Sequence, residues 1–237
     1  MAKLFTGRVL ATLLLLAAVA QGARGQALAP VERSWYVGVQ GGTSFGQGTF
    51  RSITEQKVHW GLQGGLFGGY RFNRLLSVEL GARYGAQSQY ALDCCPYWMS
   101  EEEVRYMAPV LDEHGWYYKD LRAATQWGKL ALQANIDLLS LLAKPSCRWS
   151  LTLSPQISAV TTSTRLITPD REIPHERQWH LGLGGEAGIG FQISQSVGVA
   201  LYGSITCLTG ERFDNIPIHA HKSNLLWDAG LKLTFGL

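Results

Sequence analysis

The chain has almost no charge imbalance and no long apolar run beyond its N-terminus. It carries 21 Lys and Arg residues against 18 Asp and Glu, a net charge of +3, so no strong field points to a nucleic-acid partner. No stretch of about 18 or more apolar residues lies outside the N-terminus, so membrane-spanning helices are not expected. Four cysteines in 237 residues are too few for a disulfide scaffold. Charged residues make up only 16% of the chain, which is low for a soluble surface.

The N-terminus has the features of a secretory signal peptide. Lys3 and Arg8 precede a short apolar core, which runs from position 9 to position 20 and is followed by small residues. Cleavage is expected near residue 20 or near residue 25. We therefore predict a signal peptide over 1–25 and an exported domain over 26–237. An uncleaved membrane anchor is the alternative, and the short apolar core argues against it.

Apolar and polar side chains alternate with period two in eight segments, which predicts strands with one apolar and one polar face. The clearest is the last segment, Asn224–Leu237, which carries Trp227 and Leu231 on one side and Asp228 and Lys232 on the other. Pro155 lies within the fifth segment and predicts a bulge there. The eight segments are 35–45, 58–72, 76–85, 125–138, 148–164, 178–194, 197–207 and 224–237.

The connections between these segments alternate between long and short. The long ones are 46–56, 87–123, 165–177 and 209–221, whereas 73–74, 140–146 and 194–195 are shorter. Within the longest connection, Ser100 followed by Glu103 matches a capping box and predicts a short helix to about Ala108. Outer-membrane barrels have short periplasmic turns and long extracellular loops. The sequence therefore predicts an all-β fold, an eight-stranded antiparallel up-and-down transmembrane β-barrel with long extracellular loops.

With the apolar faces outward, the inward faces carry equal numbers of positive and negative groups. An eight-stranded barrel is barely wide enough for its own side chains, so these charges are expected to pair in a polar plug. The predicted lumen charge network consists of Arg71, Glu79, Arg83, Lys129, Asp137, Glu186, Asp228 and Lys232. Tryptophans near strand ends are expected to form interfacial girdles, namely Trp35, Trp60, Trp127, Trp149, Trp179 and Trp227. A secreted lipocalin-like ligand binder, with the apolar faces turned inward, is an alternative.

The last strand also carries a motif, Asp228-x-Gly230-x-x-Leu233-x-Phe235. In this motif and in its strand pattern, the chain resembles the small porin-like members of the outer-membrane β-barrel protein families. The resemblance implies an outer-membrane location and an assembly signal at Asp228, Gly230, Leu233 and Phe235, although Gly236 and Leu237 extend past the usual end. It also implies outer-membrane lipid and the barrel-assembly machinery as partners. The role it implies is structural or interactive, or limited passage of small solutes.

Some barrels of this size are enzymes that modify lipids, and this is a second alternative. His180 and Glu186 share a strand face, but six residues place them roughly 20 Å apart, too far for direct partnership. The pattern His219-x-His221 lacks a further ligand at defined spacing, so no metal, cofactor or catalytic site is predicted.

The long connections suggest two further features. The loop that carries Glu101–Glu103 and Trp116–Tyr118 is a candidate surface for an extracellular protein partner, and a periplasmic partner is also open. Either Cys94 or Cys95 is a candidate to form a disulfide with Cys207, because export permits disulfides, and free thiols are the alternative.

Overall fold

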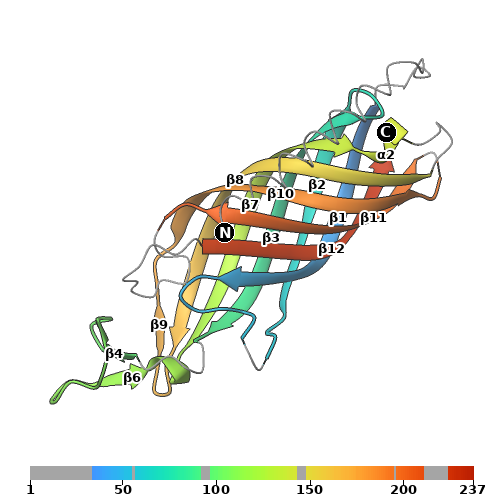
Figure 1. Ribbon diagram of the computed structural model, residues 1–237. Helices are drawn as coiled ribbons and strands as arrows, with labels where there is room; N and C mark the ends of the chain where they lie inside the picture. The colour runs from blue at the N-terminus through green and yellow to red at the C-terminus, as the bar shows by residue number, and fades with distance from the viewer. Residues whose placement is uncertain (1–33, 55–56, 92–96, 143–147, 195, 211–223) are drawn as a thin grey trace, which may run out of the picture.

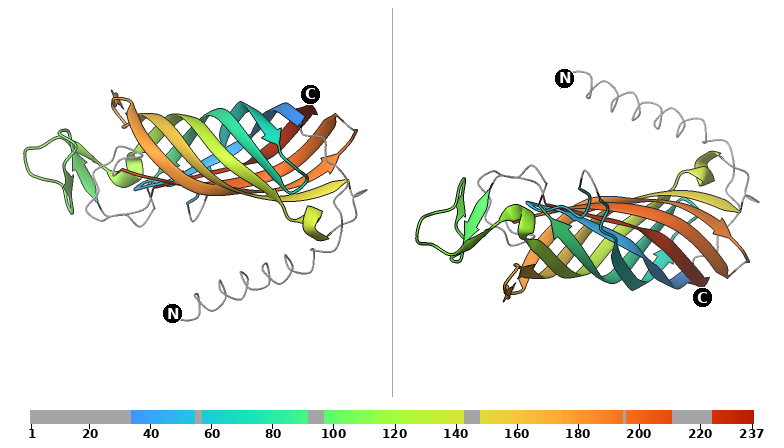
Figure 2. Two further views of the ribbon diagram at one scale, coloured as in Figure 1. Left: turned by 90° about the horizontal axis from the view of Figure 1, so that it is seen from above. Right: turned by 90° about the horizontal axis from the view of Figure 1, so that it is seen from below.

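A computed structural model describes residues 34–54, 57–91, 97–142, 148–194, 196–210 and 224–237. Eight long strands form one closed antiparallel barrel (Figures 1 and 2). This confirms the predicted all-β, eight-stranded antiparallel barrel, whereas the extracellular position of its long loops stays a prediction. In chain order the strands are β1 Ser34–Gln47, β2 Gly61–Arg71, β3 Leu76–Tyr90, β7 Arg122–Asp137, β8 Trp149–Ile167, β10 Gln178–Gln192, β11 Val197–Leu208 and β12 Asn224–Gly236. No helix in these ranges is long and apolar enough to cross a membrane.

Each strand pairs with its neighbour in the chain, and the last strand closes the barrel. β12 pairs with β11 on one edge and with β1 on the other, so Lys232 lies opposite Ala200 and Gln40. The closing strand continues past its motif, because the Gly236 amide donates to the Ser196 carbonyl and the Leu237 amide to the Trp35 carbonyl. Hydrogen bonding around the ring leaves no open edge among these strands.

The barrel has two different ends. At the turn end, strands are joined across 72–75, 138–148 and 193–196, with the short helix α2 Leu139–Leu142 in the second of these. At the loop end, the connections are 48–60, 91–121, 168–177 and 209–223. Figure 1 shows β9 Glu172–Pro174 and the small strands β4 and β6 at the end opposite α2.

The longest connection contains a second sheet, in the order β5-β4-β6. Its strands are β4 Trp98–Ser100, β5 Arg105–Tyr106 and β6 Gly115–Tyr117, followed by the 3-10 turn η2 Tyr118–Asp120. The helix predicted from Ser100 is wrong. Glu103 has φ 63°, which ends any helical path, and the Ser100 hydroxyl caps a turn by accepting from the Val104 amide at 3.3 Å. The pattern of Ser100 followed by Glu103 thus forms the tight turn between β4 and β5 instead of the start of a helix.

The bulge predicted at Pro155 is also wrong. The register between β8 and β10 is constant from Gln178↔Thr162 to Phe191↔Trp149, so no residue is inserted. On the β7 side, pairing stops after Gln133↔Gln156 and resumes in the same register at Ile136↔Leu153. Proline has no N–H to donate, so it opens a gap in the ladder without shifting it.

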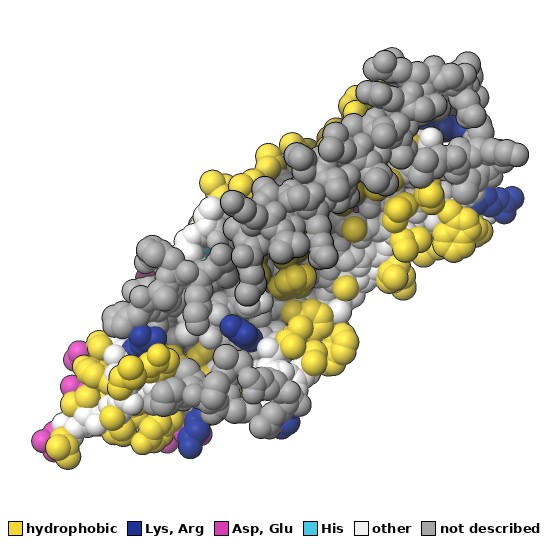
Figure 3. Space-filling model, in the orientation of Figure 1, with side chains coloured by type: hydrophobic (Ala, Val, Ile, Leu, Met, Phe, Trp, Pro, Cys, Tyr) yellow, Lys and Arg dark blue, Asp and Glu magenta, His cyan; other side chains and the backbone are white. Residues whose placement is uncertain are grey.

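The outward face of the barrel is apolar, and its aromatic side chains lie toward the two ends. Leucine, isoleucine and valine side chains project from every barrel strand between these ends, and Figure 3 shows them along the visible flank. Five of the six predicted girdle tryptophans are exposed on this face, namely Trp35, Trp60, Trp149, Trp179 and Trp227. The prediction is wrong for Trp127, which is only 1% exposed. Trp127 lies two residues from Lys129, and residues two apart on a strand share a face, so it points into the lumen.

Candidate functional site: a buried charge network and a loop-end sheet

Six of the eight charged residues predicted for the lumen meet in its centre, and we call these six the charge network. They are Glu79 and Arg83 of β3, Lys129 of β7, Glu186 of β10, and Asp228 and Lys232 of β12. Three are cations and three are carboxylates, so the network is neutral when all are ionised. All six side chains are buried.

The network is one chain of ion pairs. Arg83 pairs with Glu186 and lies 3.4 Å from the Asp228 carboxylate, which Lys129 also approaches at 3.5 Å. Lys232 joins the other carboxylates, since its Nζ pairs with Glu186 and lies 2.9 Å from Glu79 Oε1. Each buried charge therefore has an opposite charge beside it, which offsets the cost of removing it from water.

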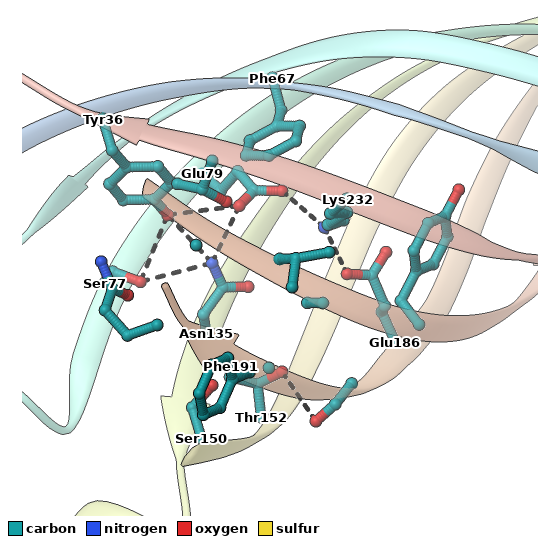
Figure 4. A pocket seen from close by; sticks show the side chains of 18 of the residues that line it. Tyr36, Phe67, Ser77, Glu79, Asn135, Ser150, Thr152, Glu186, Phe191 and Lys232 are labelled. Carbon is teal, nitrogen blue, oxygen red and sulfur yellow. Dashed lines mark hydrogen bonds and ion pairs between the residues drawn. The ribbon is translucent and has the colours of Figure 1, made fainter. Parts of the chain in front are cut away.

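Neutral side chains complete the coordination of these charges (Figure 4). Glu79 accepts hydrogen bonds from Gln133 at 2.9 Å and from Tyr36 at 3.3 Å. Asn135 donates to both Glu79 and the Tyr36 hydroxyl. Gln133, Tyr36 and Asn135 are not among the residues predicted for the lumen charge network. All three occupy inward-facing positions of β1 or β7, and this alternation in the sequence could have placed them in the lumen.

The other two predicted network residues lie elsewhere. Asp137, at the end of β7, accepts hydrogen bonds from the amides of Leu139 and Leu151, both at 3.1 Å, and so holds the turn before β8. Arg71, at the end of β2, is exposed, with its guanidinium 5.9 Å from the centre of the Tyr36 ring. Both residues have the inward parity but lie at the turn end, beyond the reach of the charge network.

The lumen holds a cavity on one side of the charge network and an apolar layer on the other. Toward the turn end, a cavity of about 140 Å³ is lined by Tyr36, Asn135, Thr152, Glu186 and Lys232 among others (Figure 4). Toward the loop end lies a cluster of buried apolar side chains, namely Trp127, Val160, Leu208 and Leu226. Polar and apolar side chains thus occupy successive levels of the lumen.

The loop-end sheet, which we define as β4, β5 and β6, stands on a core of its own. That core draws on two connections and the strand ends beneath them, through Phe50, Ala91, Met99, Trp116, Tyr118, Leu121, Ala123 and Leu166. Polar contacts also join the sheet and its turns to the β8–β9 hairpin. Trp116 Nε1 donates to Asp170 at 2.7 Å, His175 Nε2 lies 2.8 Å from Glu103, and Arg171 pairs with Glu101.

The tip of this connection exposes apolar side chains among acidic ones. Leu111 is 92% exposed, Met107 is 74% exposed and Val104 is 44% exposed. The exposed carboxylates around them are Glu101, Glu102, Asp112 and Glu113. Figure 3 shows hydrophobic and acidic side chains together at this end of the molecule.

The motif residues of the last strand divide between its two faces. Asp228 belongs to the charge network, and Gly230 packs against β1, where a Cβ atom would lie 2.2 Å from the Gly41 carbonyl oxygen. Leu233 and Phe235 have the outward parity and lie opposite Val39 and Val37 of β1. Their role as an assembly signal stays a prediction.

His180, considered above with Glu186, is hydrogen bonded on both sides of its ring. His180 is held between the Thr209 carbonyl at 2.8 Å and the Thr162 hydroxyl at 3.0 Å. A carbonyl can only accept, so Nδ1 carries a proton and donates it to the Thr209 carbonyl. No group of three or more His, Cys, Asp or Glu side chains in the described ranges is placed to hold a metal ion.

The predicted disulfide falls partly outside the described residues. Cys207 is exposed on the outward face of β11 and is a free thiol in the structure. Positions 94 and 95 lie outside the described ranges, as do His219 and His221. The pairing with Cys94 or Cys95 therefore stays a prediction.

The family model for the outer membrane protein beta-barrel domain matches residues 9–225. No curated protein sequence matches the chain. Among solved structures, Neisserial surface protein A is similar, with 12% identity, a TM-score of 0.49, and coverage of 85% of this chain and 96% of that one.

Two further solved structures are similar at lower TM-scores. Ail, the attachment invasion locus protein of Yersinia pestis, has 10% identity and a TM-score of 0.45, with coverage of 86% of this chain and 100% of that one. The outer membrane protease OmpT from Escherichia coli has 8% identity and a TM-score of 0.41, with coverage of 91% and 100%.

Proposed function

The chain belongs to the family of outer membrane protein β-barrel domains and lies in the outer membrane, and on that premise we propose that it is a plugged barrel with a structural and interaction role. Short turns of such barrels face the periplasm and long loops face the exterior. The turn end is then periplasmic, and the loop-end sheet is presented outside the cell. Family membership and the polar lumen both argue against the secreted lipocalin-like alternative.

The buried charge network is the observation that carries the proposal of a plug. A conducting pore requires a continuous column of water. These six side chains are instead buried and form ion pairs with one another across the lumen. Opening a path would separate ion pairs in a site of low dielectric constant, which is costly. This supports an interaction role over passage of solutes.

Reconstitution into planar bilayers tests the plug. We expect no stable single-channel steps from the folded protein at any applied voltage that the bilayer withstands. The matched test replaces Lys232 and Glu79 together by alanine, which removes one cation and one carboxylate and leaves the remaining network neutral. Large, stable steps from the unaltered protein would refute the proposal.

The loop-end sheet is the proposed recognition surface. Exposed apolar side chains gathered in one region typically mark interaction sites, and Val104, Met107 and Leu111 are all exposed in one connection that also carries four exposed carboxylates. Complementary charge steers encounter, so the partner surface is expected to be basic around an apolar centre. The core beneath the sheet holds the surface in place without a partner, which limits the entropy lost on binding.

A binding experiment tests this surface directly. The protein in phosphatidylcholine nanodiscs is titrated with a synthetic lysine- and leucine-rich peptide, and binding to empty nanodiscs is subtracted. We expect the double substitution Met107→Ser and Leu111→Ser to abolish the specific signal, and added salt to weaken it. Ile53→Ser, which removes an exposed apolar side chain from a different connection, is the control. Equal binding by all three proteins would contradict the assignment.

The proposed role is not enzymatic. The engagement of His180 by Thr209 and Thr162 supports a structural use of that histidine. Incubation of the folded barrel with labelled lipid A or phospholipid tests this, and turnover above a heat-denatured control would overturn it.

A further inference from the structure

The outward wall of the barrel contains an apolar groove at the place where the hydrogen-bond ladder is interrupted. It measures about 450 Å³ and crosses four strands, β3, β7, β8 and β10. Its outward side chains are all apolar, and the two glutamines at its floor are buried. The lining residues used below are Val78, Leu132, Ala134, Pro155, Ile157 and Leu183.

Two features of the sequence produce the groove. Pro155 faces Ala134 across the gap in the β7–β8 ladder, and both side chains are short. Around them, larger side chains stand out from the wall, since Leu132, Ile157 and Leu183 are all exposed. The small side chains of Ala134 and Pro155 are therefore surrounded by larger ones, and a depression is left between them.

The groove lies at the middle of the apolar band. Trp149 marks the turn-end girdle on β8, and Thr161, which pairs with Trp179, marks the loop-end girdle. Pro155 is six residues from each. Twelve residues span roughly 40 Å along a strand. At a tilt of about 35–45°, this corresponds to roughly 30 Å of height, near the thickness of the hydrocarbon region.

We propose that this groove binds one acyl chain of an outer-membrane lipid. The bilayer centre contains hydrocarbon and excludes charged or hydrated ligands, so the occupant must be apolar. A flexible chain fits a narrow depression between Leu132, Ile157 and Leu183, and its contacts replace those lost at the short Ala134–Pro155 pair. The headgroup lies at a girdle, outside the groove. This site lies away from the loop-end sheet, and none of the six residues of the charge network lines it.

Native mass spectrometry of the full barrel tests the proposal. The protein is released from nanodiscs of palmitoyl-oleoyl-phosphatidylethanolamine under increasing collision energy, and the population that retains one lipid is measured. Ala134→Leu fills the groove from β7, and Val78→Phe fills it from β3. Gly64→Leu is the matched control, because Gly64 faces outward on β2 and an added Cβ would meet its nearest heavy atom at 3.7 Å. Heat-modifiable migration on gels verifies that each variant is folded.

We expect the singly lipid-bound population to fall at least about tenfold in both filled variants and to stay unchanged in Gly64→Leu. Repeating the release with palmitate in place of the phospholipid should preserve the difference, because the chain and not the headgroup is bound. Equal retention by all folded variants would overturn the proposal. So would a dimer mass in the unaltered protein that disappears in the filled variants, since the groove would then hold a second copy of the chain.

Discussion

Replacement of Arg83 by methionine removes the central cation of the charge network and leaves a side chain of similar length. The guanidinium is 2% exposed and serves two carboxylates, Glu186 and Asp228, while its flat face lies 5.0 Å from the centre of the Tyr202 ring. Methionine retains the apolar contacts of the side chain but supplies no charge. The perturbation is therefore mainly electrostatic.

The structure sets the size of the effect. Removing one partner of a buried ion pair costs about 3–5 kcal/mol, because the other charge stays buried. Here neither carboxylate is left alone. Asp228 still has Lys129 at 3.5 Å and the Ser204 hydroxyl at 3.0 Å, and Glu186 still has Lys232. We therefore expect a loss at the lower end of that range, about 3 kcal/mol.

Equilibrium unfolding of the barrel in lipid vesicles, with denaturant and tryptophan fluorescence, measures this loss. Arg165→Met is the control, since its ion pair with Glu172 is 3.7 Å long and both side chains are more than half exposed. Such a pair contributes about 0–1 kcal/mol. Adding Glu186→Gln to Arg83→Met restores neutrality and should recover part of the stability. A loss below about 1 kcal/mol for Arg83→Met, or strict additivity in the double variant, would refute the argument.

Three further outcomes are expected from the same structure. Trp127→Ala should cost about 3–5 kcal/mol in the unfolding assay because it empties part of the lumen, whereas Trp179→Ala, on the outward face, should cost less. Gly42→Ala should destabilise by at least about 2 kcal/mol, since the new Cβ would lie 2.1 Å from the Ala229 carbonyl oxygen, and Gly64→Ala should be tolerated. His59, outside the strands, has a pKa lowered below 6.5 by burial and then by nearby cations, so its contribution to stability should decrease as the pH falls through 6.5. NMR titration of its ring protons measures that pKa directly.

The faces of the strands could be predicted from the sequence because they follow from a local rule. Side chains two residues apart share a face, so the inward placement of Glu79, Arg83 and Lys232 needs no knowledge of the partner strands. The same rule places Trp127 inward, because it lies two residues before Lys129. Its assignment to the girdle relied on nearness to a strand end, which is a weaker criterion than parity.

The pairing within the lumen could not be predicted in the same way. Which inward charges meet depends on the stagger of all eight strands around the closed barrel, and that is a global quantity. Arg71 and Asp137 occupy inward-facing positions, but they lie at the turn end of the barrel and not at its centre. The loop-end sheet was missed for a related reason, since its short strands pair only with one another and carry no long alternating pattern.

The charge network also bears on how the barrel selects one register. A slip of β12 by one residue would turn its inward side chains toward lipid. Lys232 at the middle of the bilayer would then cost about 2–4 kcal/mol. Asp228 would leave with it, and Arg83, Lys129, Glu79 and Glu186 would lose partners inside the lumen. Leucines on the outward face would tolerate the lumen better than these charges tolerate lipid, so the penalty comes mainly from the network. The charge network, which we propose as a plug, thus also favours the register in which the last strand closes the barrel.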